Sequence, residues 1–419
     1  MLKSYIQKAL STLPANAPEA QKNLLKALAA RVPREDLEQY DPELFAEMTV
    51  RHWNLARARK PGDRKFEVGS AVLKGESYRK TVIDFVNDDM AFLVDSIAAE
   101  INKKNLLIDL LLHPVVYVLY DKSGKMVDAS DTPKKDYVRQ SHIHVHIRET
   151  LSEERLENLK TGLATALEDV YIANRDWKLM LERLKEARNE LARAKTKYAA
   201  KDIERYCAFL DYLHDNNFTL LGYREYQFAG QDKNIQSKTL KGASLGLLND
   251  DIIPAFINEN EEGLPRNLQQ LRRDLPPVSV SKTNRLSTVH RRVPMDAIAV
   301  KTYDANGNPK GEKLFLGLFT SVTYSRSVSD VPYLREKVDE IMEMSDFLPG
   351  SHNRKTLRHI LEKYPRDELF QIPNEELYEI ALEILRLQER QRIALFMRLD
   401  AFKRYVSCLV YVPRDRFGT

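Results

Sequence analysis

The sequence predicts a mixed α+β protein whose first folded domain is a ferredoxin-like β-α-β-β-α-β unit. Three neighbouring segments carry this prediction. Residues 81–86 alternate like a strand, and residues 88–104 place apolar side chains at three- and four-residue spacing, as in an amphipathic helix. Residues 106–120 then form a long apolar run rich in branched and aromatic side chains, which favours a second strand.

The rest of this unit follows in order. Asn87, Asp88 and Asp89 stand between the first strand and the helix, where short polar side chains cap the first free amides. A turn at 121–124 ends the apolar run, and residues 141–148 alternate again. A helix at 152–168 and a short last strand at 169–173 complete the predicted unit.

The flanking segments are also patterned. Helices are predicted before the unit at 2–13, 20–30 and 42–59, which could pack as a small helical cap, and a charged connecting helix is predicted at 174–200. A helix at 201–215 is predicted next. A mostly antiparallel sheet follows, with strands at 218–226, 276–281, 287–290, 297–303 and 313–324. A surface loop is expected at 258–277. Helices at 333–343, 353–362 and 374–392 then precede strands at 393–400 and 405–412. Because no helix follows to cover this strand pair, we expect the chain to be part of a longer polypeptide.

The composition excludes several classes of protein. The 65 basic and 61 acidic residues nearly cancel, with a net charge of +4, so a nucleic-acid partner is not favoured. No signal peptide and no bilayer-length apolar run is present, which predicts a cytosolic protein without a membrane partner. Cys207 and Cys408 lack metal-ligand spacing, so reduced, buried thiols are expected. Only 15 glycines are present, and nucleotide-loop and nucleophile motifs are missing, so no cofactor-binding or catalytic residue is predicted.

Three histidines in the last predicted strand of this unit could hold zinc. His142, His144 and His146 recur at every second residue, so their side chains share one face of the predicted strand. Spaced along a strand, their ring nitrogens would be about 6 to 7 Å apart, which is awkward for one tetrahedral ion. We therefore predict no metal site, and we expect these histidines on a solvent or domain-contact face of the sheet.

Two further groups are candidate binding residues. Asn87, Asp88 and Asp89 could bind the amino or carboxyl group of an amino-acid effector, although helix capping explains them equally well. A basic cluster could take an anion or form an interface patch: Lys282, Arg285, His290, Arg291 and Arg292. Asp367 and Glu368 are adjacent at a predicted helix start, which favours helix-end stabilisation over acid-base catalysis.

Several blocks of the sequence are similar to one family. These blocks are VNDDMAFLVD at 86–95, HP at 113–114, FTLLGYREY at 218–226, SK at 281–282, STVHR at 287–291, FLGLFTS at 315–321, YPRDELF at 364–370 and CLVYVPRDR at 408–416. They resemble the amino-terminal half of the large bacterial NAD-specific glutamate dehydrogenases. Ala91 stands where that family has proline, a change that the first turn of a helix tolerates well.

The resemblance implies an order of domains. They are a helical N-terminal segment at 1–62, an ACT-like domain at 75–175, a connecting helix at 176–199, a PAS-type domain at 200–328, a helical segment at 329–392 and the start of a second ACT-like domain at 393–419. In this family the parent enzyme oxidatively deaminates L-glutamate to 2-oxoglutarate and ammonia with NAD. The resemblance places the catalytic domain and its NAD site beyond residue 419, so no cofactor and no activity are expected in this chain alone.

The leading hypothesis is a regulatory and oligomerisation region of that dehydrogenase. Its expected partners are the remainder of the dehydrogenase polypeptide, a second copy of the chain and an amino-acid effector at Asn87, Asp88 and Asp89. One alternative is a free-standing amino-acid-binding or RNA-binding regulatory protein, because the RNA-recognition fold shares the split β-α-β plan. A complete enzyme is the third possibility.

Overall fold

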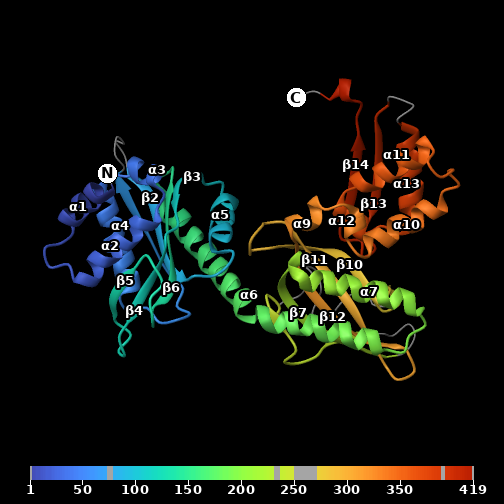
Figure 1. Ribbon diagram of the computed structural model, residues 1–419, viewed down its shortest axis with the longest axis horizontal. Helices are drawn as coiled ribbons and strands as arrows, with labels where there is room; N and C mark the ends of the chain where they lie inside the picture. Colours follow the sequence, from blue (N-terminus) through green and yellow to red (C-terminus); the bar gives the residue numbers. More distant parts are fainter. Residues whose placement is uncertain (1, 73–78, 231–235, 250–270, 388–391, 418–419) are drawn as a thin grey trace. The chain divides into compact units, whose positions relative to one another are not determined.

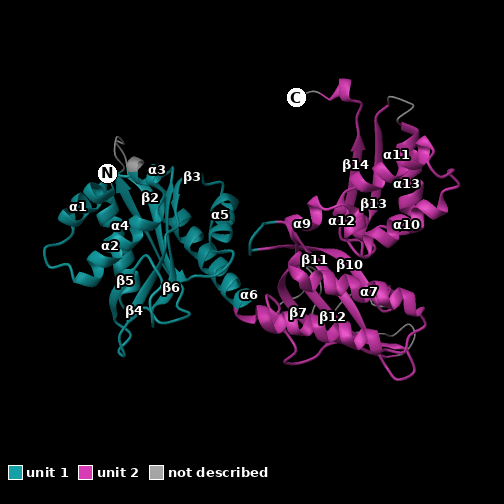
Figure 2. Ribbon diagram, in the orientation of Figure 1, with its two compact units in different colours: residues 1–174, 288–292 teal, residues 175–287, 293–419 magenta. Residues whose placement is uncertain are grey.

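The computed structural model describes residues 2–72, 79–230, 236–249, 271–387 and 392–417, and it contains two compact units (Figures 1 and 2). Unit 1 comprises residues 1–174 and 288–292, and unit 2 comprises residues 175–287 and 293–419. The mixed α+β prediction is confirmed, since both units combine helices with antiparallel sheets. Among the described residues, none of the helices combines the length and the apolar character needed to cross a membrane.

Unit 1 is built on a six-stranded antiparallel sheet with the order β1-β2-β6-β4-β5, in which β3 also pairs with β6. The strands are β1 (Lys65–Val72), β2 (Arg79–Asp88), β3 (Ile108–Leu112), β4 (Val115–Tyr120), β5 (Met126–Ser130) and β6 (Val138–Ile147). In the register of β2 and β6, Asp84 lies opposite His144. Because side chains alternate along a strand, Asp84 and the three histidines of β6 point to the same face.

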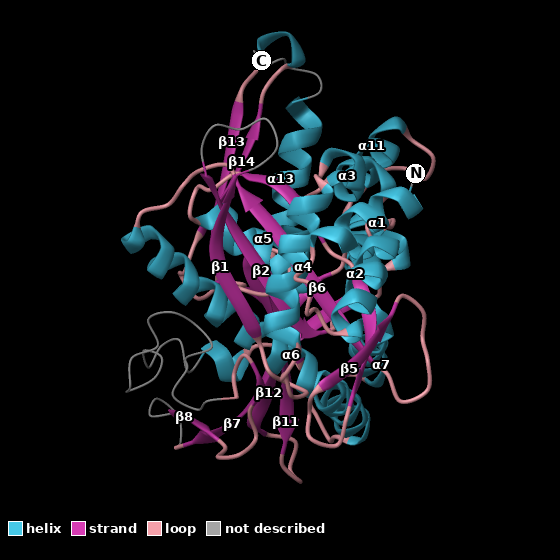
Figure 3. Ribbon diagram, turned by 90° about the vertical axis from the view of Figure 1, so that its left-hand side faces the viewer, coloured by secondary structure: helices cyan, strands magenta, loops and turns pink. Residues whose placement is uncertain are grey.

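Helices cover both faces of this sheet (Figures 1 and 3). On the histidine face lie α1 (Leu2–Thr12), α2 (Glu19–Arg31), α3 (Arg34–Gln39) and α4 (Pro42–Ala56). Their apolar side chains share one core with those of β2, β3, β4 and β5. The side chain of Asp41 caps α4 by accepting a hydrogen bond from the Glu43 amide, as its sequence position predicts. On the other face lie α5 (Leu93–Lys103) and the first half of α6 (Glu153–Arg193).

The structure corrects several predictions for unit 1. The helix expected at 88–104 begins at Leu93, and β2 continues through Asp88, so residues 87–89 do not cap it. The run at 106–120 is two strands, because Pro114 between them has no amide hydrogen to donate to a sheet. The strand expected at 169–173 is wrong, since these residues continue α6 with Val170 and Ala173 buried at helical spacing. The sheet edge beside β2 is formed by β1, and the ferredoxin-like topology stays a prediction.

Unit 2 is built on a second six-stranded antiparallel sheet, with the order β10-β11-β12-β7-β8 and with β9 on β7. The strands are β7 (Phe218–Ala229), β8 (Gln236–Thr239), β9 (Leu245–Gly246), β10 (Val278–Leu286), β11 (Pro294–Tyr303) and β12 (Pro309–Phe319). α7 (Ala200–Tyr212) precedes the sheet and ends in a π-helical turn, Leu213–Asn217. The strand expected at 287–290 is wrong: these residues form a bend in which His290 has a φ of 66°.

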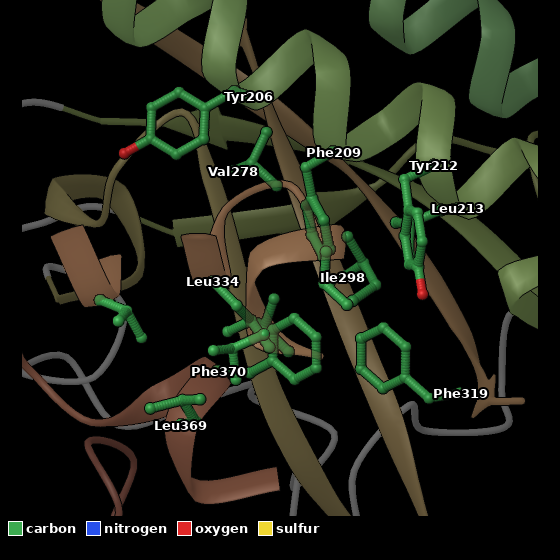
Figure 4. Close-up of a cluster of buried hydrophobic side chains, with 14 of the residues drawn as sticks. Tyr206, Phe209, Tyr212, Leu213, Val278, Ile298, Phe319, Leu334, Leu369 and Phe370 are labelled. Carbon is green, nitrogen blue, oxygen red and sulfur yellow. The ribbon is translucent and has the colours of Figure 1, made fainter. Parts of the chain in front are cut away.

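The carboxyl-terminal part of unit 2 is helical and ends in a hairpin. Its elements are α9 (Ser321–Ser325), a 3-10 turn (Val328–Asp330), α10 (Leu334–Met344), α11 (His352–Lys363), α12 (Arg366–Gln371), α13 (Asn374–Leu387), β13 (Ala394–Leu399), β14 (Val406–Tyr411) and a second 3-10 turn (Arg414–Arg416). The ring of Phe370 on α12 stacks on Phe319 of β12, with 4.4 Å between centroids. Figure 4 shows how these rings, with Phe209 of α7, join the helices to the sheet in one core.

The predictions for unit 2 have different outcomes. Cys207 is buried as expected, but Cys408 is exposed, because it lies on the β13-β14 hairpin, where Met397 and Val410 are also exposed. The surface loop expected at 258–277 lies largely outside the described residues. So does the end of the helix expected at 374–392. The PAS-type assignment of 200–328 and the other domain boundaries stay predictions.

Candidate functional site

A cluster of buried polar side chains lies between α4 and the sheet of unit 1. His142, His144 and His146 are each fully buried, so they do not line a solvent face. The layer that covers them contributes three more members: Tyr40 at the end of α3, and Arg51 and His52 on α4. Asp84 of β2 completes the cluster and is also fully buried. The prediction that the three histidines share one face of the sheet is confirmed, but the sequence did not predict that helices cover this face.

The Asp84 carboxylate is the centre of this cluster. Its Oδ1 lies 2.5 Å from His144 Nδ1 and 2.9 Å from His52 Nε2, and its Oδ2 lies 2.5 Å from Arg51 Nε. His144 makes a regular hydrogen bond, whereas the His52 Nε2 contact is not aligned as one. Asp84 thus faces two imidazoles with one oxygen and a guanidinium with the other.

Charge in the cluster follows from burial. Burial alone would raise the pKa of Asp84, but the charge and hydrogen bond of His144 and the contact with His52 hold it well below its usual range. Burial lowers the pKa of His144 despite the opposing effect of Asp84, and it lowers the pKa of His146 to about 3. The Arg51 guanidinium beside Oδ2 also favours the ionised form of the Asp84 carboxylate.

Two branches extend from Asp84. In one, His52 Nδ1 lies 3.0 Å from His142 Nδ1. In the other, His144 Nε2 lies 2.6 Å from His146 Nε2, and Tyr40 Oη lies within 3.3 Å of both nitrogens. The expected separation of about 6 to 7 Å is therefore wrong for this pair. That expectation placed the two rings as far apart as their backbone positions. The side-chain torsions of His144 and His146 instead turn the two rings toward each other.

The predicted effector residues are placed at one end of the same sheet. The Asp88 carboxylate accepts hydrogen bonds from the Arg59 guanidinium and the Gly62 amide. The Asp89 carboxylate accepts from the Ser141 hydroxyl and pairs with Arg139. The Asn87 side chain is 1% exposed, and neither its amide oxygen nor its nitrogen has a partner among the described residues.

The predicted basic cluster is divided between the two units. Lys282 belongs to unit 2, where its ammonium pairs with Asp296 at 2.8 Å and with Asp367 at 3.3 Å. Residues 288–292 belong to unit 1, where His290 Nδ1 lies 2.7 Å from an Asp95 oxygen. Arg285 and Arg291 also have partners, and Arg292 is exposed. Lys282 is thus already neutralised, and binding of an anion by these residues stays a prediction.

A cavity of about 470 Å³ in unit 2 was not predicted from the sequence. Its lining includes Tyr206, Lys337, Phe370, Arg398 and Asp400. The Lys337 ammonium donates hydrogen bonds to the carbonyl oxygens of Leu369 and Ile372, and burial, with a smaller effect of Arg398, lowers its pKa to about 7. These residues come from separate helices and strands, so no local motif could have revealed the cavity.

Three family models match different parts of the chain, and all three describe domains of glutamate dehydrogenase. Residues 24–163 match the family model described as "Glutamate dehydrogenase, ACT1 domain". Residues 331–390 match "Glutamate dehydrogenase, helical motif 1", and residues 394–419 match "Glutamate dehydrogenase, ACT2 domain". The first match begins within α2 and so includes α3 and α4, which pack on the sheet in one core.

Similar proteins carry the same name. The chain is 31% identical over 406 residues to the NAD-specific glutamate dehydrogenase of Halomonas elongata, covering 93% of this chain and 24% of that protein. It is 32% identical over 341 residues to that of Pseudomonas aeruginosa, covering 81% and 21% respectively. The Mycobacterium tuberculosis enzyme is 24% identical over 371 residues, covering 88% and 22%. The chain therefore spans about a quarter of the length of the curated relatives it matches, less than the half expected.

Among solved structures, the chain was compared with that of an RNA-binding light-oxygen-voltage receptor. It is 10% identical, with a TM-score of 0.14, over 76% of this chain and 89% of that chain. This score is too low to support any structural argument.

The two α+β units and the three matched models define a multidomain protein of the glutamate dehydrogenase type. More specifically, the chain belongs to the NAD-specific glutamate dehydrogenases, of which it represents an amino-terminal part. The resemblance stated from the sequence is thereby confirmed.

Proposed function

We propose that this chain is a regulatory and assembly region of an NAD-dependent enzyme that deaminates L-glutamate to 2-oxoglutarate and ammonia. The observation that supports this proposal is the succession of three matched glutamate dehydrogenase models along the chain, in the order ACT1, helical motif 1 and ACT2. The partners we propose are the remainder of the dehydrogenase and a second copy of the chain. The unpaired cysteines are in keeping with a cytosolic location.

The effector site that we propose lies at the carboxyl end of β2. An α-amino acid presents one ammonium and one carboxylate. The Asn87 amide offers both a donor and an acceptor, and neither has a partner among the residues that the structure describes. Nearby, the Ser141 hydroxyl donates to Asp89 and lies 3.0 Å from His113 Nε2. A bound ammonium would share the Asp89 carboxylate with Arg139, and a bound carboxylate would accept from the Asn87 amide.

Isothermal titration of this chain with a panel of amino acids tests the effector site. We expect heat from at least one amino acid, and we expect Asn87→Leu to abolish it, because leucine has a similar volume but no polar atoms. Asp88→Ala is a poorer choice, since Asp88 holds Arg59 and the Gly62 amide. Asn102→Leu is the matched control, because Asn102 is exposed on α5 in the same unit.

The outcomes separate the parts of the proposal. Absence of heat with every amino acid, or equal heat with wild type and Asn87→Leu, removes the effector site. Sedimentation velocity addresses assembly, for which a monomer at every concentration would contradict self-association. The regulatory role itself fails if the full-length dehydrogenase responds to no amino acid, or responds identically with Asn87→Leu.

A further inference from the structure

We propose that His52, Asp84 and His144 bind one divalent transition-metal ion with zinc-like preferences, which fixes α4 to the sheet of unit 1. One ligand atom from each of the three residues lies within 4.8 Å of the others, and all three residues are buried. They come from three elements, α4, β2 and β6, that are distant in sequence. Among the described residues, no second set of three such side chains meets this distance.

The donor atoms select the class of metal. Two imidazole nitrogens and one carboxylate oxygen suit zinc and the neighbouring transition metals, whereas calcium and magnesium prefer oxygen ligands alone. Three protein ligands also leave one coordination position for a small non-protein ligand.

The present distances are close to those that an ion requires. Asp84 Oδ1 lies 2.5 Å from His144 Nδ1 and 2.9 Å from His52 Nε2. Ligand atoms around a tetrahedral zinc ion are about 3.4 Å apart, which follows from bond lengths of about 2.1 Å. The separation from Asp84 Oδ1 must therefore grow by about 0.5 Å for His52 and by about 0.9 Å for His144. His52 Nε2 faces Asp84 Oδ1 and has no regular hydrogen-bond partner among the described residues.

The other ring nitrogens of His52 and His144 also have neighbours that suit a metal site. A histidine that ligates a metal with one ring nitrogen usually donates a hydrogen bond from the other. Here His52 Nδ1 lies 3.0 Å from His142 Nδ1, and His144 Nε2 lies 3.1 Å from Tyr40 Oη. When the ion takes the place of the proton between His144 Nδ1 and Asp84, that proton moves to His144 Nε2. His52 Nε2 and His144 Nδ1 then ligate while their other ring nitrogens donate.

Arg51 could donate a hydrogen bond to the fourth, non-protein ligand of the metal. Its Nε contacts Asp84 Oδ2, so Asp84 can offer Oδ1 to the ion without losing this pair. One terminal nitrogen of Arg51 is buried and has no hydrogen-bond partner among the described residues. A hydroxide or another small anion on the metal would accept from this nitrogen and offset the added positive charge.

Cobalt binding to the whole chain is the direct test. The protein has two tryptophans, and Trp53 directly follows His52 in α4. In a Trp177→Phe background, fluorescence reports Trp53 alone. We expect chelator-treated protein to bind about one Co²⁺ per chain, with visible absorption of a four-coordinate site and quenching of Trp53. We also expect Zn²⁺ to compete for this site and to raise the unfolding temperature.

Variants locate the ion. His144→Ala and His52→Ala should weaken binding by more than 100-fold, and Tyr40→Phe, which removes only a supporting hydrogen bond, by about 10-fold. His113→Ala is the control, because His113 contacts Ser141 outside this cluster and should leave binding unchanged. If a ligand variant does not fold, the cobalt absorption and Trp53 quenching of the parent protein still decide.

Three results would overturn the proposal. The first is a metal content near zero after growth with zinc, together with no cobalt absorption and no Trp53 quenching. The second is full-strength binding by a folded His144→Ala variant, which would place the ion elsewhere. The third is an unfolding temperature that zinc leaves unchanged, since an ion linking α4 to β2 and β6 must stabilise the folded state.

Discussion

Lys337 provides a sharp test of the energetics of unit 2. Its side chain on α10 is 7% exposed, and its ammonium donates to the carbonyl oxygens of Leu369, at 2.9 Å, and Ile372. Burial is the main cause that lowers its pKa from 10.5 to about 7. The folded protein therefore releases this proton at a lower pH than the unfolded chain, which retains it to about pH 10.

The lowered pKa of Lys337 makes the stability of the folded protein depend on pH. Because the folded pKa is depressed, this group's contribution to stability is fully present above the unfolded pKa and is lost as the pH falls toward 7. One pKa unit corresponds to about 1.4 kcal/mol, so the free energy of unfolding should rise by about 2 kcal/mol between pH 7 and pH 9. Lys337→Met removes this contribution, and its stability should gain correspondingly less over the same interval.

Urea unfolding of both proteins at pH 7 and pH 9, followed by Trp177 fluorescence in a Trp53→Phe background, measures the difference. Lys363→Met is the control, because Lys363 is exposed on the neighbouring α11 and should change with pH as the parent protein does. The same pH dependence in the parent protein and in Lys337→Met would refute the reasoning, because a buried lysine with an unperturbed pKa contributes no such slope.

Two further predictions concern unit 2. Glu312 pairs with Lys301 at 2.6 Å and with Arg272, and all three side chains are buried. Glu312→Gln should destabilise the protein by about 3 to 5 kcal/mol, because it removes the carboxylate that faces two buried cations. A loss of under about 1 kcal/mol in urea unfolding would contradict this. Gly246 has a φ of +60°, and an added Cβ would lie 2.3 Å from the Leu221 carbonyl oxygen. Gly242 has a similar φ of +74°, but an added Cβ would meet no atom within 4 Å. Gly246→Ala should therefore cost more stability than Gly242→Ala. Equal melting temperatures of these two variants would count against the close approach.

Local patterns identified many elements of the chain. The alternating strands at 81–86 and 218–226 are present, as is the helix that begins after Asp41, because periodicity and capping depend on nearby residues. The same local reasoning failed at residues 87–89. Their side chains suit a helix cap, but long-range contacts of Asp88 with Arg59 and Gly62 hold them at the end of β2.

At the histidine cluster, the sequence determined one feature and the tertiary structure decided the others. Period-two spacing alone determined that His142, His144 and His146 share one face, because side chains alternate along any strand. Only the tertiary structure decided that this face is buried under α4 and that Asp84, 60 residues from His144, is its hydrogen-bond partner. The physical reason is that strand pairing and helix packing bring together residues distant in sequence, and burial then sets the charge that each group carries.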